Sequence, residues 1–241
     1  MGMIDFLVHS VMLPILTYFY AMTASYGVAI IFLTIVIKAA LMPLTFQSIR
    51  AQMDMQKIQP KLKELQKKYK DKPEIYNKKV IEFYKENRVN PLGGCLPILI
   101  QMPFFIGLYS TFMSEEFKTL AGHNSSFLFI TDLTRLGLTH NGVYYFDNFL
   151  LIMLFGITTF ISQKMMITNP DDPMQKQMLY MMPVMITFMF AFVPVPSGAL
   201  LYIVVSNLIT ILQNIFVINK KKATRAIGRF VSLHPHNLSQ K

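Results

Sequence analysis

Residues 26–46 read YGVAIIFLTIVIKAALMPLTF, an apolar run of twenty-one residues that carries a single charge, on Lys38. About twenty apolar residues are what a helix needs to cross the roughly 30 Å hydrocarbon core of a bilayer. A lysine at the centre of such a helix costs about 2.5–3.5 kcal/mol on insertion scales, so an intramembrane charge usually marks a function or a partner. This stretch predicts a first membrane span, residues 25–46, built around a buried positive charge.

The composition is that of a membrane protein throughout. Of the 241 residues, 53% are hydrophobic and 15% are charged, whereas a typical soluble domain has about 25% charged residues. Further apolar runs predict four more spans, at residues 92–113, 148–167, 177–195 and 199–218. The predicted fold class is therefore an all-α integral membrane protein with five transmembrane helices.

The N-terminal segment, residues 1–24, is apolar but is interrupted by Asp5, His9 and Pro14. This pattern favours an external interfacial helix with aromatic side chains at the level of the headgroups. The alternative is that the segment is itself a span. Within the first span, Pro43 is expected to kink the helix near its cytoplasmic end, because proline removes one backbone hydrogen bond.

Charged residues are distributed unevenly along the chain. Residues 47–91 hold twelve Lys/Arg and six Asp/Glu, residues 219–241 hold six Lys/Arg and no acid, and residues 114–147 hold two Lys/Arg and four acids. Cytoplasmic segments collect Lys and Arg. We therefore place residues 47–91 and the basic tail 219–241 in the cytoplasm and the loop 114–147 outside, with the N-terminus outside and the C-terminus in the cytoplasm.

The segment 47–91 reads as two charged helices joined by a turn at Asp71-Lys72-Pro73. Apolar residues of the first helix recur on one face, at Ile58, Leu62, Leu65 and Tyr69. A second, weaker stripe follows at Val80, Phe83, Tyr84 and Asn87. Two facing stripes and a short connection predict an antiparallel helical hairpin in the cytoplasm.

Polar side chains recur at helical spacing inside the predicted spans. They are Thr34, Lys38 and Thr45 in the first span, Gln101 in the second, Thr159 and Gln163 in the third, and Ser206, Thr210, Gln213 and Asn214 in the fifth. Lipid offers no hydrogen bonds, so these groups should face one another or a water-filled cavity. For the Ser, Thr and Gln side chains, interhelical hydrogen bonding and a cavity both remain open.

Lys38 favours the cavity. The predicted spans contain no Asp or Glu to neutralise it, and it lies nine residues, or about 13 Å, from Gln47 at the cytoplasmic end. One interpretation is a lysine that reaches toward lipid phosphates. The other is a cation in a hydrated groove, which would attract acidic residues of a passing hydrophobic polypeptide.

Catalysis is poorly supported by the sequence. The predicted spans contain no Asp, Glu or His, which excludes paired carboxylates and helical HExxH metal sites there, and no Walker-type glycine loop is present. We therefore predict a protein that is not an enzyme and has no catalytic residue, metal site or cofactor.

Four motifs resemble the YidC/Oxa-type membrane protein insertases in order and spacing. They are TIVIKAALMPLTFQSIRAQ at 34–52, NPLGGCLPILIQMPFFIGLY at 90–109, MQKQMLYMMPVMITFMF at 174–190 and PSGALLYIVVSNLITILQN at 196–214. The chain is similar to the short form of this family, which lacks the large periplasmic domain. The resemblance implies a five-span core with a cytoplasmic helical hairpin, and a groove open to the cytoplasm and lipid but closed outside.

The resemblance also assigns individual positions. The family's groove arginine falls on Lys38 and its second-span groove glutamine on Gln101. Lysine keeps the charge of arginine but loses its bidentate fork, and Ile203 stands where the family often has tryptophan. The predicted substrate groove comprises Lys38, Thr34, Thr45, Gln101, Gln163, Ser206, Thr210 and Gln213.

The predicted function is that of an insertase and chaperone of the bacterial cytoplasmic (inner) membrane, which moves nascent hydrophobic segments from the cytoplasm into lipid. The implied partners are nascent membrane proteins and the lipid bilayer. The hairpin and the basic tail would face the ribosome, signal recognition machinery and the Sec translocon. The alternative is a small multi-span transporter or channel for an anionic solute.

Overall fold

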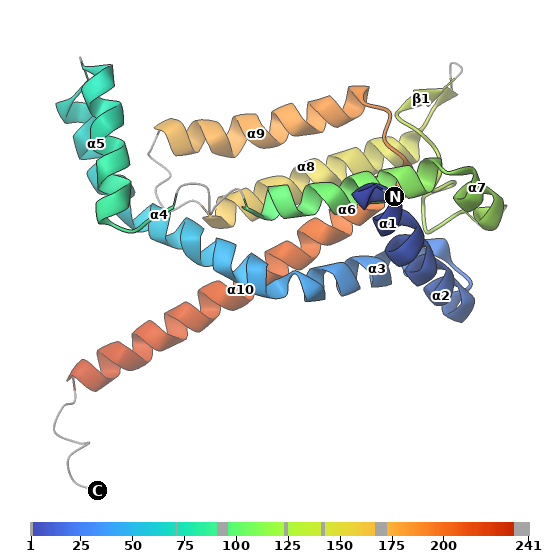
Figure 1. Ribbon diagram of the computed structural model, residues 1–241, viewed down its shortest axis with the longest axis horizontal. Helices are drawn as coiled ribbons and strands as arrows, with labels where there is room; N and C mark the ends of the chain where they lie inside the picture. The colour runs from blue at the N-terminus through green and yellow to red at the C-terminus, as the bar shows by residue number, and fades with distance from the viewer. Residues whose placement is uncertain are drawn as a thin grey trace, which may run out of the picture.

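The computed structural model describes residues 2–70, 72–90, 96–122, 125–140, 143–166 and 173–233. Long helices that run side by side make up most of the described chain, and one short β-hairpin lies at the end of the bundle that also holds α7 (Figure 1). The elements are α1 (Met3–Phe6), the π-helix η1 (Leu7–Met12), α2 (Leu13–Thr23), α3 (Tyr26–Ala40), α4 (Met42–Lys68), α5 (Pro73–Glu86), α6 (Leu96–Met113), α7 (Glu115–Ala121), β1 (Thr139–His140), β2 (Val143–Tyr144), α8 (Phe146–Met166), α9 (Pro173–Phe192) and α10 (Ser197–Leu233).

The first predicted span is bent sharply just beyond Lys38. Helix α3 ends at Ala40 and α4 begins at Met42, with an angle of 64° between them. Pro43 explains the break: it has no N–H to donate, and its ring would clash with the carbonyl of Ala39 four residues earlier. The expected kink is therefore present, centred on Leu41, and it leaves Lys38 in the last turn of α3.

The N-terminal segment forms one continuous helical stretch from Met3 to Thr23, with a π-helical turn in its middle. Ala24 ends it in the left-handed conformation, at φ 54°. By length and hydropathy this stretch could cross a bilayer, although in Figure 1 it slants across the end of the long helices. Its interfacial position stays a prediction.

Two other described helices, Phe146–Met165 and Ser197–Val217, are long and apolar enough to cross a membrane, and the bent pair α3–α4 would make one further span. Helices α6 and α9 contribute shorter apolar stretches, Leu99–Met113 and Leu179–Phe192. Residues 92–95, the predicted start of the second span, lie outside the described part of the chain. The count of five spans stays a prediction.

The core lies between α3, α6, α8 and α10. Helix α3 buries Ala29, Ile30, Leu33 and Ile37, which recur on one helical face. That face contacts α10, whose first two turns are buried from Ala199 to Tyr202. The opposite side of α3 exposes Phe32, Ile35 and Val36, as expected of a helix that faces lipid.

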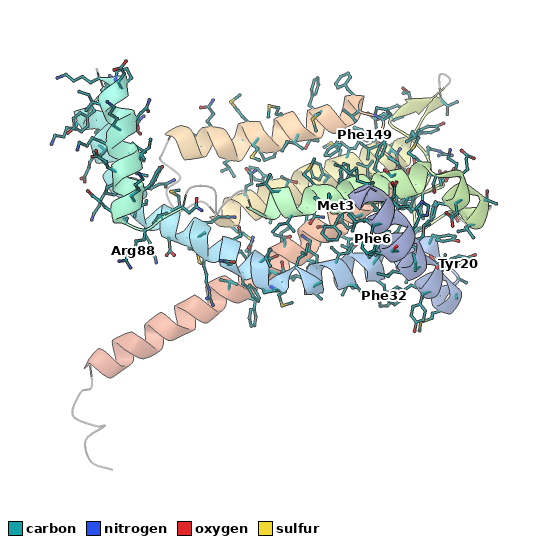
Figure 2. The ribbon with its side chains drawn as sticks, viewed as in Figure 1. Met3, Phe6, Tyr20, Phe32, Arg88 and Phe149 are labelled. Atoms are coloured by element: carbon teal, nitrogen blue, oxygen red, sulfur yellow. The ribbon has the colours of Figure 1, made fainter. Side chains whose placement is uncertain are left out.

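Aromatic side chains hold the N-terminal helix to this core. The rings of Tyr20 and Tyr26 stack at 4.0 Å between centroids, and Phe19 stacks on Phe32 at 4.8 Å. Figure 2 shows Tyr20, Phe32 and Phe149 at the same end of the molecule, far from Arg88 near the charged α5. The bundle thus has an aromatic end and a charged end.

The loop 114–147, expected as a polar connection, is instead folded onto the aromatic end. Ser114 caps α7 by accepting a hydrogen bond from the Phe117 backbone N–H at 3.2 Å. Phe117, Ile130 and Leu133 from this loop are fully buried in the core. The loop therefore closes one end of the helix bundle.

The charged segment 47–91 contains the two expected helices. The part of α4 beyond the bend buries Ile58 and partly buries Leu62, Leu65 and Tyr69, whereas Lys61, Glu64, Lys67 and Lys68 are exposed. Helix α5 partly buries Val80, Phe83 and Tyr84 and contacts α4. The predicted apolar faces are therefore the less exposed ones. The antiparallel hairpin and its place in the cytoplasm stay predictions.

Helix α10 is longer than the predicted fifth span. It begins at Ser197 and runs to Leu233, fifteen residues past the predicted end at Ile218. The predicted basic tail is thus helical as far as Leu233, and its last residues, 234–241, lie outside the described part of the chain. Helix α8 also begins early, at Phe146, two residues before the predicted start.

We expect Gly27→Ala to lower the melting temperature of the purified protein. A Cβ at Gly27 would lie 1.9 Å from Cγ of Phe127, so the ring and its loop must move. Such overpacking costs about 1–3 kcal/mol, which exceeds the gain of up to about 1 kcal/mol from replacing glycine in a helix. Thermal unfolding in detergent measures the change.

Gly107→Ala is the matched control. Its Cβ would meet the flexible end of Met12, at 3.0 Å from Cε, and would lie in ordinary contact with Leu7 Cβ at 3.6 Å, so we expect a smaller loss or a gain in melting temperature. Equal losses for the two variants would contradict the packing described for Phe127.

Candidate functional site

Lys38 donates a hydrogen bond to α10. Lys38 Nζ donates to Thr210 Oγ1 at 3.2 Å, and the Thr210 hydroxyl donates in turn to the Ser206 carbonyl at 2.9 Å. Within the described ranges no carboxylate forms an ion pair with Lys38. The charge is therefore held by a neutral partner and retains unused donor capacity, because an ammonium group has three N–H donors.

One helical turn before Ser206, Tyr202 on α10 contacts α6 through a hydrogen bond. The Gln101 side-chain amide donates to the hydroxyl of Tyr202, which is fully buried. Tyr202, Ser206, Thr210 and Gln213 follow one another on a single face of α10. The structure thus brings Gln101, Lys38, Ser206 and Thr210 onto this face of α10.

A second face of α10 carries polar contacts to α8. The Asn207 amide donates to the hydroxyls of Thr159 at 2.9 Å and Thr158 at 3.2 Å. Gln163 lies one turn beyond Thr159 on α8, and Asn214 lies two turns beyond Asn207 on α10. By this spacing Gln163 lies on the same face of α8 as Thr159, as the sequence predicts, and its place in a groove with Lys38 stays a prediction.

The two threonines predicted beside Lys38 bond within their own segments. Thr34 is fully buried and donates to the Ile30 carbonyl at 2.7 Å. Thr45 lies beyond the bend, in α4, and donates to the Leu41 carbonyl at 3.0 Å. The face expected to join Thr34, Lys38 and Thr45 is interrupted at Leu41. The roles of both threonines in a groove stay predictions.

Several amide atoms near the far end of these two faces are buried and unpaired. Among the described residues, no hydrogen-bond partner reaches Gln163 Oε1, Gln213 Oε1 and Nε2, or Asn214 Oδ1. Gln213 is 8% exposed and Asn214 is 2% exposed. An unpaired buried polar group costs about 1–3 kcal/mol, so the cluster is a place where a hydrogen-bonding ligand would be stabilised.

Asn207 and Tyr202 are the polar residues of the site that the sequence did not single out. Both lie in the fifth-span motif, and Asn207 precedes Asn214 by seven residues, a spacing that returns to the same helical face. That i, i+7 pair of asparagines was the signal that could have identified an α8-facing stripe.

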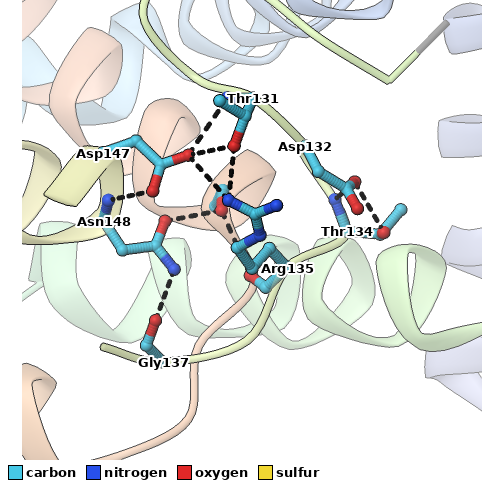
Figure 3. A network of polar contacts seen from close by, with 8 residues as sticks. Thr131, Asp132, Thr134, Arg135, Gly137, Asp147 and Asn148 are labelled. Carbon is cyan, nitrogen blue, oxygen red and sulfur yellow. Dashed lines mark hydrogen bonds and ion pairs between the residues drawn. The ribbon is translucent and has the colours of Figure 1, made fainter. Parts of the chain in front are cut away.

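A second polar cluster lies at the aromatic end, around an acid that was expected to lie outside the spans. Asp147 is in the first turn of α8 and is 6% exposed. Its Oδ2 accepts hydrogen bonds from Thr131 N at 3.0 Å and Thr131 Oγ1 at 2.7 Å, and it pairs with Arg135 at 3.5 Å (Figure 3). Asp147 lies one residue before the predicted third span, and α8 begins early enough to include it.

The same cluster connects the loop to the start of α10. Buried Asn148 donates to the Gly137 carbonyl at 2.6 Å and accepts from Ser197 Oγ at 2.5 Å. Backbone bonds add to this connection, from Ser197 N to the Arg135 carbonyl and from Gly198 N to the Leu133 carbonyl. The turn 195–198 is thus buried under the loop and fixed to it.

The two clusters suit different tasks. The aromatic-end cluster pairs its own charges, whereas on the other side of the bundle Lys38 has a neutral hydrogen-bond partner and several buried amide atoms have none among the described residues. Among the described residues no three His, Cys, Asp or Glu side chains are grouped as metal ligands. The arrangement can therefore bind a polar or acidic chain by charge and hydrogen bonds.

Comparison with known proteins covers most of the chain. The model of the family described as 60Kd inner membrane protein matches residues 18–225. Proteins named membrane protein insertase YidC are similar: that of Citrifermentans bemidjiense is 42% identical over 88% of this chain and 36% of its own length. Those of Pelobacter propionicus and Haemophilus influenzae are 43% and 42% identical, over 84% and 83% of this chain and 36% and 34% of theirs.

A solved structure has a similar fold. The structure titled "Active YidC insertase crystal structure with the first transmembrane domain resolved" superposes with a TM-score of 0.69 at 26% identity, over 86% of this chain and 45% of that one. The chain spans about a third of the length of the curated relatives named above.

We expect Asp147→Asn to destabilise the aromatic end. Each carboxylate oxygen accepts from an N–H, Oδ2 from Thr131 and Oδ1 from Asn148. An amide must turn its NH2 toward one of these donors, at a cost of about 1–3 kcal/mol. A lower melting temperature in detergent is the expected result.

Asp132→Asn is the control, because Oδ1 of Asp132 alone accepts both bonds from Thr134, at 2.8 and 2.7 Å, and asparagine makes the same turn. If Asp132→Asn lowered the melting temperature as much as Asp147→Asn, the argument that Asp147 needs both of its oxygens as acceptors would be refuted.

Proposed function

Because the chain belongs to the 60 kDa inner membrane protein family, whose curated relatives are named membrane protein insertase YidC, we propose that it moves nascent hydrophobic segments from the cytoplasm into the lipid of the bacterial inner membrane. The observation that carries this proposal is Lys38, an intramembrane cation whose described partner is the neutral hydroxyl of Thr210. Insertion makes and breaks no covalent bond, so every residue assigned below acts by binding.

In this proposal the Lys38 ammonium attracts the acidic tail of the client. A hydrophobic segment with a short acidic tail approaches from the cytoplasm, and the tail must leave water to pass α3. An ammonium in a low-dielectric setting attracts a carboxylate far more strongly than it does in water. Gln101 of α6, together with Ser206, Thr210 and Gln213 on the adjoining face of α10, supplies hydrogen bonds to the polar tail.

The direction of passage follows from the two ends of the bundle. The loop cluster around Asp147 and Asn148 supports a closed outer end, because its charges and amides are satisfied among themselves. The unpaired amides of Gln163, Gln213 and Asn214 support a polar groove that opens to the cytoplasm. This orientation places the N-terminus outside and the basic segments in the cytoplasm, in agreement with the distribution of Lys and Arg.

Release into lipid would be driven by burial of the client's apolar surface. The faces of α3 and α10 that point away from the core expose Ile35, Val36, Leu212 and Phe216. A client segment that slides along these faces enters hydrocarbon, which is worth about 25 cal/mol for each Å² of apolar area removed from water. The acidic tail then leaves Lys38 for the external side.

The charged segments would meet the cytoplasmic machinery. Helices α4 and α5 and the end of α10 carry most of the surplus lysine and arginine, which suits binding to ribosomal RNA or anionic lipid. We propose the ribosome, the signal recognition machinery and the Sec translocon as partners of these segments. A transporter of a small anionic solute would use the same cation, but it would need an external opening and would give solute flux in liposomes.

We expect Lys38→Ala and Lys38→Glu to impair insertion of a single-span client with an acidic tail, and Lys38→Arg to retain it. Alanine removes the attraction and glutamate repels the tail, whereas arginine keeps the charge. A loss of about tenfold or more corresponds to removal of a charged hydrogen bond, worth about 1.5–3 kcal/mol. Protease protection of the client in proteoliposomes measures insertion.

A client whose tail acids are changed to Asn and Gln is the control, since its insertion should depend little on Lys38. Wild-type insertion of the acidic client by both Lys38→Ala and Lys38→Glu would refute the role of the charge. If the wild-type protein took up small anions and inserted no client, the transporter would be favoured.

A further inference from the structure

The loop 114–147 and the first turn of α8 carry polar groups inside and apolar side chains at their tips. Asp147 and Asn148 are 6% and 0% exposed and are hydrogen-bonded, whereas Leu128 and Phe146 are 83% and 67% exposed. Turns that meet water carry polar residues at their tips. Among the described residues of the loop, the exposed charges are gathered on α7: Glu115, Glu116 and Lys118. The apolar tips therefore suit an environment other than water.

The first tip is a tight turn with a leucine in an unusual conformation. Phe127 and Ile130 exchange two backbone hydrogen bonds of 2.8 Å, which places Leu128 and Phe129 at the turn. Leu128 has φ 52°, a left-handed conformation that bulky side chains rarely adopt and that Gly, Asn or Asp normally supplies in turns. A Cβ at Gly27 would meet the Phe127 ring, so the turn lies beside the first turn of α3, where the predicted span begins.

The second tip continues an apolar stripe that runs along α8. The members of the stripe recur every three or four residues and are all exposed: Phe146, Phe149, Met153, Ile157 and Ile161. Strand β2 adds the exposed Val143 and Tyr144. The ring of Phe149 lies 6.2 Å from the rings of both Tyr144 and Phe146. The hairpin thus extends the face of α8 that is suited to lipid.

The length of α8 sets the depth of this second tip. The exposed Lys164 lies near the other end of α8, eighteen residues, or about 27 Å, from Phe146. The hydrocarbon core is about 30 Å thick, and a lysine near a helix end extends its ammonium to the headgroups. With Lys164 at one boundary, Phe146 lies at the other. Val143 and Tyr144 then lie at the headgroup level, where aromatic side chains are enriched.

We propose that the two tips, Leu128–Phe129 and Val143–Phe146, insert into the boundary between headgroups and acyl chains and anchor the loop to the bilayer. Phospholipid is the occupant: its acyl chains meet the apolar side chains, and its ester and phosphate oxygens accept from the Tyr144 hydroxyl. In the orientation proposed above this is the outer leaflet. The anchor uses no residue of the predicted groove and does not depend on the insertase function.

An introduced tryptophan reports its own surroundings, because the chain contains none. Phe129→Trp and Tyr144→Trp place it at the two tips, and Val143→Trp is a second reporter of the hairpin. Ile157→Trp, in the middle of the α8 stripe, and Thr119→Trp, on the charged α7, are the controls. Each variant that keeps the wild-type melting temperature in detergent is reconstituted alone into phosphatidylcholine and phosphatidylglycerol vesicles. Bromine on the acyl chains, near the headgroup or near the chain end, quenches tryptophan that it contacts.

We expect the tip reporters to lose most of their fluorescence to bromine near the headgroup and little to acrylamide in the water. The emission of Ile157→Trp should be quenched most by bromine near the chain end, and that of Thr119→Trp by acrylamide.

Three results would overturn the proposal. The tip reporters could be quenched by acrylamide as strongly as Thr119→Trp and not by bromine. Only one of the two tips could be quenched by bromine. Both tips could be shielded from both quenchers until the vesicles are diluted with excess lipid, which would mean that a second copy of the chain covers them. Protection from acrylamide that appears only in native membranes would assign the tips to another protein and would equally contradict a lipid anchor.

Discussion

The hydrocarbon core of a bilayer offers no hydrogen-bond partner, and this constraint governs where polar groups lie in the described structure. Thr34 and Thr45 return their hydroxyls to carbonyls of their own segments. Asn207 uses two threonines of α8, and Gln101 uses the hydroxyl of Tyr202. These groups have hydrogen-bond partners within the protein, whereas a buried group without a partner marks a place where a further partner would be stabilised.

Helix α10 combines both kinds of group along one element. At its start, Ser197 and Gly198 are fixed by the loop through Asn148 and backbone bonds. Its middle contributes Thr210 as the partner of Lys38, and the turn beyond carries the unpaired Gln213 and Asn214. Along α10, polar groups are therefore fully hydrogen-bonded at the end covered by the loop, and some have no partner among the described residues toward the end that we propose to be cytoplasmic.

The sequence predicted a large part of this arrangement. Apolar runs and Pro43 were sufficient for α3, the break near Leu41 and the helical class, and the motifs were sufficient for the family. The contact of Asn207 with Thr158 and Thr159 could not be predicted, because periodicity gives a face of one helix but not the neighbour it meets. The early start of α8 was missed since Asp147 looks like a loop residue until Thr131 and Arg135 satisfy its carboxylate. The buried loop was missed for the same reason, as tertiary contacts override local polarity.

The continuous extent of α10 has a mechanical consequence. Its 37 residues span about 55 Å at 1.5 Å per residue, while the hydrocarbon core is about 30 Å thick. If its first turns lie at the outer boundary, roughly 25 Å of helix project past the inner one; in Figure 1 the end of α10 extends beyond the neighbouring helices. A helix is stiff over that length. A displacement of the far end of α10 would therefore also move the turns that hold Thr210 and Gln213. A large partner that bound this end of α10, such as one that delivers clients, would thereby be coupled mechanically to the site through a single helix.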